Sequence, residues 1–302
     1  MTRITPRLAL LLTLPPLLWA GNAVVGRLVV GTVPPLTLNF LRWALAGLVL
    51  LPLGWRALRE PRQIAQRWPF LLLLGLLGVG SYNSLQYLAL VTSTPINVTL
   101  IAASMPVWML LVGSLFYGVH PTRAQIAGAV LSLAGVLLVI ARGSLDDLLA
   151  VHFVRGDLYI VAAIIAWSFY SWMLASPPAH MRGSERPDWG WAEMLLVQVI
   201  FGLMGSGLAA GAEHLAGAAP IRWSGWLLAA LAYVALGASI VAYRSWGLGV
   251  TAAGPAIAAF FSNLTPVFAA VLSAAVLGEP PRWFHAAAFA LIVAGIFVSS
   301  RR

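Results

Sequence analysis

The sequence predicts an all-α membrane protein in which ten transmembrane helices form two inverted five-helix repeats around a central cavity. Composition is the first of three observations behind this prediction. Hydrophobic residues make up 61% of the 302 residues and charged residues only 9%, whereas about 25% of the residues in a soluble domain are charged. The other two observations are a series of apolar windows long enough to span a bilayer and a segment that occurs twice.

The apolar windows follow one another along the whole chain. About 20 residues cross the hydrocarbon core as a helix, and the first half has such windows near residues 8–29, 35–55, 68–91, 95–117 and 122–141. The second half has them near residues 156–175, 191–212, 223–246, 252–277 and 283–300. Turn-forming pairs such as Pro34-Pro35 and Gly254-Pro255 separate them. The first window is too long for the apolar region of a secretory signal peptide, so we expect it to be retained.

A duplicated segment divides the chain into two units. Residues 95–140 align without a gap on residues 255–300, at an offset of 160 positions. Most of the shared residues are prolines and small residues, whose placement depends on backbone geometry rather than on hydrophobicity. They include Pro95/Pro255, Pro106/Pro266, Gly118/Gly278, Pro121/Pro281 and Gly135/Gly295. We expect residues 1–145 to form the first five-helix repeat and residues 146–302 the second, within one membrane domain.

The number of spans and the arginine distribution predict the topology. Two tandem halves of five spans each must insert with opposite orientations, as the inverted repeats of many secondary transporters do. All 18 basic residues are arginine. Twelve lie in segments that are cytoplasmic if the N-terminus is inside, five lie outside, and Arg42 falls within a span. Because positive residues favour the cytoplasmic side, we expect both termini in the cytoplasm and a location in the bacterial inner membrane.

Polar and aromatic side chains within the predicted spans are the candidate substrate-binding residues, because polar groups are costly there and often functional. The third span places Tyr82, Asn83 and Gln86 within about one and a half turns. The other candidates from the remaining spans are Trp19, Asn22, Asn97, Trp167, Tyr170, Tyr243 and Asn263. The alternative is structural, since amides also join helices and Trp or Tyr near span ends also form interface belts.

Arg42 leaves two interpretations open. It lies about 10 Å along the second span from Pro35, at a rise of about 1.5 Å per residue. There it can receive a substrate carboxylate, or it can bond helix carbonyls or extend to the surface.

No acidic residue falls at the centre of a predicted span, where ion-coupled carriers usually keep one. The sequence therefore predicts transport of a substrate down its own gradient. Asp157 and Glu193, near span ends, are the weak exceptions. Pro106 and Pro266 each remove a helix hydrogen bond, so we expect them to be hinges in the fourth and ninth spans; the alternative is that they only shape static helices.

The chain has no cysteine, so it has no disulfide or thiolate metal site. It also lacks the HExxH and GxSxG patterns of hydrolases and paired carboxylates within spans. We therefore expect neither an enzyme nor a bound metal or cofactor. Single arginines at span ends indicate contact with the lipid bilayer rather than with nucleic acid, and no obligate protein partner is evident.

Several motifs resemble the drug/metabolite transporter superfamily, EamA branch. They are the Trp-Ala-Gly-Asn of residues 19–22, the Phe-Leu-Arg-Trp of residues 40–43, the Gly-Asp-Leu at Gly156 and the Leu-Gly-Glu-Pro of residues 277–280. Residues 82–87 and 94–97 look more narrowly like the YddG-type aromatic and neutral amino-acid exporters. The first half departs from the pattern at Tyr117-Gly118-Val119, where the Leu-Gly-Glu motif is expected.

The resemblance implies a transporter that exports neutral amino acids, aromatic and other apolar ones above all, by alternating access as a uniporter. The alternative is export of another small organic solute, such as a hydrophobic cation, a nucleobase or a sugar conjugate.

Overall fold

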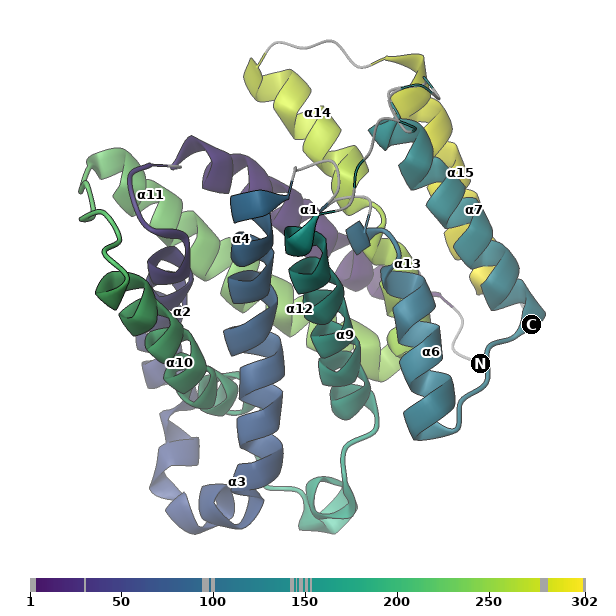
Figure 1. Cartoon of the computed structure of the whole chain (residues 1–302). Coiled ribbons are helices and arrows are strands. Elements are labelled where there is room, and N and C mark those ends of the chain that lie inside the picture. The colour runs from purple at the N-terminus through teal and green to yellow at the C-terminus, as the bar shows by residue number, and fades with distance from the viewer. Residues whose placement is uncertain are drawn as a thin grey trace.

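A computed structural model describes residues 4–29, 31–93, 98, 101–141, 144, 146, 149, 152, 154–277 and 282–300 (Figure 1). Within these residues all regular structure is helical, and no strand occurs. Six helical segments are long and apolar enough to cross a membrane: Pro35–Arg59, Pro61–Ala89, Arg155–Ala175, Trp191–Leu215, Gly225–Ala253 and Pro255–Leu272. Met105–Tyr117, Arg123–Leu138 and Trp283–Ser299 are shorter apolar helices. The predicted all-α membrane class is therefore confirmed.

Proline and glycine set the ends of the helices in the first half. Proline occupies the first helical positions of α2 and α3, where its missing N–H costs nothing. Gly118 ends α6 in the left-handed conformation, with φ of 65°. The described elements are α1 (Pro6–Leu28), α2 (Pro35–Gly54), η1 (Trp55–Arg59), α3 (Pro61–Gly75), η2 (Leu76–Ser81), α4 (Tyr82–Thr92), α6 (Met105–Tyr117) and α7 (Arg123–Ile140).

The second half has a similar succession. Its elements are α9 (Arg155–Ala175), the short η3 (Ala179–Met181) and η4 (Gly183–Glu185), α10 (Trp191–Leu215), α11 (Gly225–Tyr233), η5 (Val234–Val241), α12 (Ala242–Ala253), α13 (Pro255–Ser262), α14 (Thr265–Leu277) and α15 (Trp283–Ser299). Two boundaries differ from the predicted windows. The third span begins at Pro61, and the eighth continues to Ala253 because Gly254, with φ of 85°, is the first residue that breaks it.

The third and eighth spans each contain a π-helical segment, η2 and η5, between two α-helices. Each segment is held by a serine that bonds five residues back. The Ser81 hydroxyl donates to the Leu76 carbonyl at 2.7 Å, and the Ser239 hydroxyl donates to the Val234 carbonyl at 2.8 Å. A π-helical turn shifts the backbone hydrogen-bond pattern and is frequent at functional sites.

The two predicted hinge prolines lie just after a break in the helix rather than inside a bent one. Pro106 and Pro266 are the second residues of α6 and α14. Before α6, the Ser104 N–H donates to the Ile101 carbonyl at 3.0 Å; before α14, the Leu264 N–H donates to the Phe261 carbonyl, also at 3.0 Å. The chain therefore turns at corresponding positions in the two halves.

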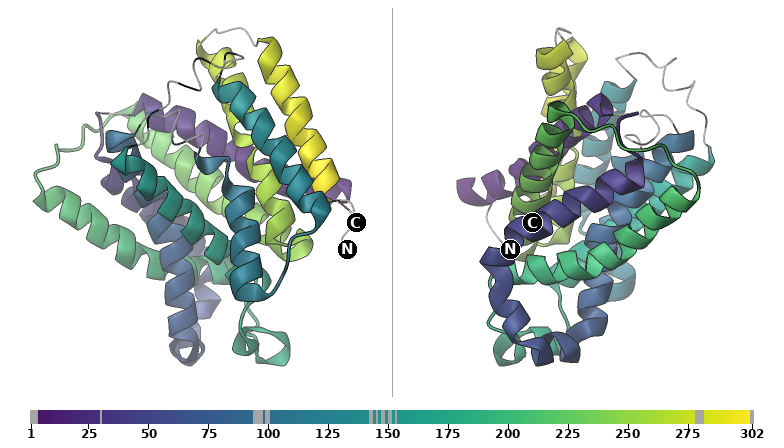
Figure 2. Two further views of the ribbon diagram at one scale, coloured as in Figure 1. Left: turned by 45° about the vertical axis from the view of Figure 1, so that its right-hand side comes forward. Right: turned by 90° about the vertical axis from the view of Figure 1, so that its left-hand side faces the viewer.

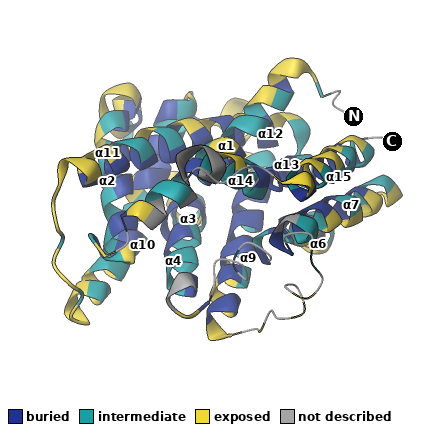
Figure 3. Ribbon diagram, turned by 90° about the horizontal axis from the view of Figure 1, so that it is seen from above, coloured by how far each residue is buried: buried dark blue, intermediate teal, exposed yellow. Residues whose placement is uncertain are grey.

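Helices α7 and α15 run side by side along one edge of the molecule (Figures 1 and 2). Glycines allow this close approach: a Cβ atom on Gly128 would lie 2.6 Å from the Gly295 carbonyl oxygen, and one on Gly135 would lie 2.8 Å from the Ala288 carbonyl oxygen. Seen from above, buried residues gather in the central helices, while exposed residues mark the outer faces (Figure 3). Many of the exposed residues are large and apolar, such as Leu115 and Leu208, as expected for surfaces that face lipid.

Candidate substrate site

Trp167 in α9 is the centre of a cluster of aromatic rings. Its ring centroid lies 4.9 Å from that of Tyr170, 5.3 Å from those of Tyr82 and Tyr243, and 5.4 Å from that of Trp19. Both halves of the chain therefore contribute rings. The angles range from tilted to nearly perpendicular, the arrangement that the charge distribution of aromatic rings favours. All five aromatic residues that the sequence singled out meet in this cluster.

Two further rings belong to the cluster, and sequence reasoning missed both. The Trp246 ring lies 5.5 Å from Trp167, and its indole donates to the Ser171 hydroxyl at 3.1 Å. The Trp43 ring lies 4.7 Å from Tyr243. A signal existed in each case: Trp246 follows Tyr243 at a spacing of three residues on the same helix, and Trp43 follows Arg42 directly.

The two π-helical segments supply backbone acceptors to this cluster. The Tyr243 hydroxyl donates to the Gly78 carbonyl of η2 at 2.6 Å. The Trp19 indole donates to the Ala238 carbonyl of η5 at 3.2 Å. Each bond crosses from one half of the chain to the other, so the polar edges of the rings are fixed by backbone atoms that ordinary α-helical bonding would normally occupy.

The predicted amide residues are distributed differently. Asn83 is buried and lies next to the Tyr243 hydroxyl. Gln86 and Asn22 are half-buried. Asn263 donates to the Ser132 hydroxyl at 2.9 Å, which connects it to α7. Asn97 lies outside the described residues.

Arg42 is almost completely buried and bonds to the second π-helical segment. Its Nε donates to the Ser239 hydroxyl at 3.0 Å, and one terminal nitrogen donates to the Ala238 carbonyl at 3.3 Å. Its guanidinium carbon lies 5.4 Å from the centre of the Trp43 ring. Arg42 therefore stays inside the protein and does not extend to the surface.

Two acidic side chains, Asp157 and Glu213, accept backbone hydrogen bonds at the starts of helices. Asp157 accepts from the Val154 N–H at 2.7 Å and from the Ser93 hydroxyl, which places its charge at the start of α9. Glu213 accepts from the Leu36 and Thr37 N–H groups at the start of α2. Both positions favour a carboxylate through the helix dipole. Among the described residues, no group of three or more potential metal ligands occurs.

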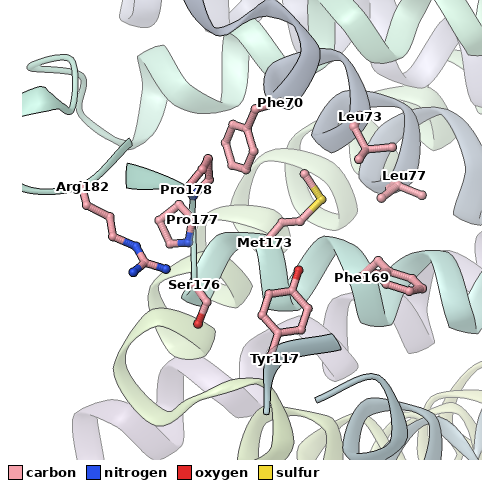
Figure 4. Close-up of a pocket in the computed structure, with 10 residues that line it drawn as sticks. All are labelled: Phe70, Leu73, Leu77, Tyr117, Phe169, Met173, Ser176, Pro177, Pro178 and Arg182. Carbon is pink, nitrogen blue, oxygen red and sulfur yellow. The ribbon is translucent and has the colours of Figure 1, made fainter. Parts of the chain in front are cut away.

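A cavity of about 510 Å³ lies against the C-terminal part of α9 (Figure 4). Phe169 and Met173 line it from α9, on either side of Tyr170 in sequence, and Tyr117 lines it from the end of α6. Arg182 and residues 176–178, which follow α9, also line it, and Phe70, Leu73 and Leu77 complete the lining. None of the predicted site residues lines this cavity.

The arrangement suits a solute with a flat or bulky apolar group. Aromatic rings with indole, phenol and amide groups at their edges are chemically suited to bind such a group. In this structure the rings pack against one another, and Trp167, Tyr170 and Tyr243 are at most 3% exposed. No described side chain in the cluster is a nucleophile activated by a neighbouring base.

Several known transporters are similar to this chain over most of its length. A curated "Uncharacterized transporter" of Archaeoglobus fulgidus is 27% identical over 97% of each chain. The "Aromatic amino acid exporter YddG" of Ancylobacter novellus is 25% identical, over 94% of this chain and 93% of its own. The "Uncharacterized inner membrane transporter YedA" of Escherichia coli K12 is 27% identical, over 87% and 80%.

A crystal structure supports the fold: it superposes with a TM-score of 0.76 at 24% identity, over 96% of this chain and 95% of its own. The model of the EamA-like transporter family matches twice, at residues 7–141 and 154–301. Its members and the relatives above are transporters, not enzymes. This multi-pass membrane protein belongs to the EamA-like transporter family.

Proposed function

We propose that the protein exports neutral amino acids with aromatic or other large apolar side chains across the bacterial inner membrane by alternating access. The observation that carries this proposal is the set of rings around Trp167, contributed by both halves of the chain. Such a set favours an apolar side chain on the substrate. Buried Asp157 and half-buried Glu213 bond at helix ends, so neither of them balances the charge of a hydrophobic cation at the rings.

The relatives support the same class of substrate. One of them is called an aromatic amino acid exporter, and it aligns with nearly the whole of this chain. The name of another places it in the inner membrane. Since identity is 25–27% in these comparisons, the side chains of this chain must carry the argument for its own substrate.

Contacts between corresponding positions support an inverted repeat. At the offset of 160, Gly128 corresponds to Ala288 and Gly135 to Gly295. The two close approaches between α7 and α15 join Gly128 to Gly295 and Gly135 to Ala288. Exchanging the halves therefore converts one contact into the other, as expected for a pseudo-twofold axis between these helices. The repeated family match supports the same interpretation, and inverted halves provide the two alternating orientations of a transporter.

The cavity beside α9 supplies a route to the cluster. Residues 176–178 and Arg182 line it, and the arginine bias assigns the segment after α9 to the cytoplasm together with both termini. A substrate approaching from the cytoplasm would meet Phe169 and Met173 first and the rings around Trp167 next. Release on the other side requires the halves to rearrange, and Pro106 and Pro266 mark where each half breaks.

We expect Trp167→Ala to lower transport of phenylalanine, tryptophan and leucine by at least about tenfold and that of alanine by less than about threefold, because only large side chains reach this ring. The measurement is uptake into liposomes that contain only this protein, with and without proton or sodium gradients. Flux should persist without either gradient.

The matched control is Trp226→Ala, which removes an exposed tryptophan from α11 and should leave the substrate ranking unchanged. Wild-type protein that moves no amino acid, or a folded Trp167→Ala variant that keeps the wild-type ranking, would contradict the proposal.

A further inference from the structure

Buried polar atoms without a hydrogen-bond partner gather on one turn of α2. In the part of the chain that the structure describes, seven buried side-chain nitrogen and oxygen atoms have no partner. Three of them are Oδ1 of Asn39, Nη1 of Arg42 and Nε1 of Trp43. Each of these residues is at most 1% exposed. A buried polar atom without a partner costs free energy, so each one in a native protein calls for an explanation, and function is a common one.

A second buried arginine shows what a purely structural role looks like. Arg67 is also buried, near the predicted cytoplasmic end, and all three of its nitrogens are bonded. They donate to the carbonyls of His180 and Glu185 and to Gln63. Arg42 uses only Nε and Nη2, both toward η5, and keeps Nη1 unbonded. Arg42 therefore has a guanidinium nitrogen with no acceptor, whereas every guanidinium nitrogen of Arg67 has one.

Arg42 also lacks an acidic partner. In the described residues the one ion pair joins Arg56 to Asp188 at 2.7 Å, and both side chains are exposed. A buried cation within a membrane span is costly unless it is paired. A carboxylate on a bound solute would pair with it through a charge-assisted hydrogen bond, which is stronger than a bond between neutral groups.

Asn39 offers the complementary atom on the same face of the helix. It precedes Arg42 by three residues, a spacing that makes side chains neighbours on a helix. Its amide nitrogen donates to the Ser84 hydroxyl at 3.0 Å, which leaves its carbonyl oxygen as an unused acceptor. Trp43 joins this turn to the aromatic cluster, because its ring contacts Tyr243, which in turn contacts Trp167.

We propose that this turn of α2 binds the head group of the transported amino acid. Nη1 of Arg42 and Nε1 of Trp43 donate to the α-carboxylate, and Oδ1 of Asn39 accepts from the α-ammonium group. The apolar side chain of the substrate then lies toward Trp167. This assignment rests on the proposed function and adds the recognition of both charged groups of the substrate.

The proposed head-group site can be tested by measuring the binding of three ligands to purified full-length protein. They are phenylalanine, phenylalaninamide, which lacks the carboxylate, and 3-phenylpropionate, which lacks the ammonium group. Arg42→Gln should weaken phenylalanine and 3-phenylpropionate binding by about 10- to 100-fold, the range for a hydrogen bond to a charged group. It should change phenylalaninamide binding by less than about threefold. Asn39→Leu should weaken phenylalanine and phenylalaninamide by about tenfold and leave 3-phenylpropionate unchanged.

Arg67→Gln is the matched control, since it removes a buried arginine in which each of the three guanidinium nitrogens already has an acceptor. It should lower thermal stability without altering the preference among the three ligands. If Arg42→Gln does not fold, Arg42→Lys keeps the charge but not the planar fork, and should still lower the preference for phenylalanine over its amide by several-fold.

The possible failures are distinguishable. Wild-type protein that binds none of the three ligands overturns the proposed function together with this site. Wild-type protein that binds phenylalanine, with folded Arg42 variants that retain the wild-type preference for phenylalanine over its amide, overturns the head-group site alone.

Discussion

The π-helical segments η2 and η5 carry the same backbone device with different side chains around it. In both, a serine hydroxyl bonds to the carbonyl five residues earlier, and a nearby carbonyl accepts from the other half of the chain. The Gly78 carbonyl of η2 receives the neutral hydroxyl of Tyr243. The Ala238 carbonyl of η5 receives both the Trp19 indole and the Arg42 guanidinium. The two segments therefore share a backbone arrangement, but among the described residues only η5 has a charged side chain, Arg42, bonded to it.

The difference suits the proposed function, in which a duplicated scaffold binds a substrate with two unlike ends. Each segment presents a backbone carbonyl that accepts from an aromatic residue of the other half: Gly78 accepts from Tyr243, and Ala238 accepts from Trp19. An amino acid has a charged end and an apolar end, so two identical half-sites would fit it poorly. In the proposed site, the buried guanidinium beside η5 supplies the polar end and the rings around Trp167 supply the apolar end.

The largest expected difference between the two segments comes from their glycines. A Cβ atom on Gly78 would approach within 3 Å of three atoms of the buried Tyr170 ring, whereas one on Gly237 would meet Leu18 and Tyr233 at 3.5 Å, an ordinary contact. We therefore expect Gly78→Ala to destabilise the protein by about 3 kcal/mol through overpacking. Gly237→Ala should be neutral or stabilising by up to about 1 kcal/mol, the helix propensity gained.

Thermal unfolding of both variants in detergent measures this difference. Equal stabilities for Gly78→Ala and Gly237→Ala would show that η2 and η5 are packed equally tightly around these glycines, contrary to the expected difference.

A smaller difference is expected between the two serines. Ser239 is fully buried and, besides bonding Val234, accepts from Nε of Arg42. Ser239→Ala leaves a buried charged donor without its partner and should cost about 2 kcal/mol. Ser81 is half-buried and bonds only Leu76, so Ser81→Ala should cost about 0.5–1 kcal/mol.

The same unfolding measurement, repeated in an Arg42→Gln background, isolates the cause. If the extra cost of Ser239→Ala persists there, it does not come from the guanidinium, and the charge asymmetry between η2 and η5 loses its energetic support.

The smallest effect on stability is expected at the two breaks. Pro106 and Pro266 stand at the second position of α6 and α14, where a proline removes no helical hydrogen bond. Replacing either one by alanine should cost about 0.4–1 kcal/mol, chiefly because the unfolded chain gains conformational freedom. If the breaks act as hinges, turnover should slow by a factor of about 2 to 10, as expected when an access-switching motion is hindered.

Transport into liposomes and substrate binding in detergent separate the two properties. Single variants show whether the halves contribute equally to the motion. Unchanged transport rates in the double variant would mean that both prolines only shape static helices.

Much of this architecture could be predicted from local sequence. The apolar windows, the proline and glycine boundaries and the Pro106 and Pro266 positions depend on hydrophobic periodicity and backbone sterics, which act within a few residues. For the same reason, Trp19, Tyr82, Trp167, Tyr170 and Tyr243 could be selected as candidates, since aromatic and polar residues are conspicuous within apolar spans.

Local sequence was therefore enough to predict most of the helices, many of their ends, and the residues from which a site could be built. Only the tertiary structure decided which of the 13 tryptophans meet, because Trp43 and Trp246 join the cluster through contacts between distant helices. It also decided that Asn263 bonds to α7 and that Arg42 keeps an unused donor. These outcomes depend on which backbone carbonyls η2 and η5 release and on which helices face them, and no local pattern encodes either.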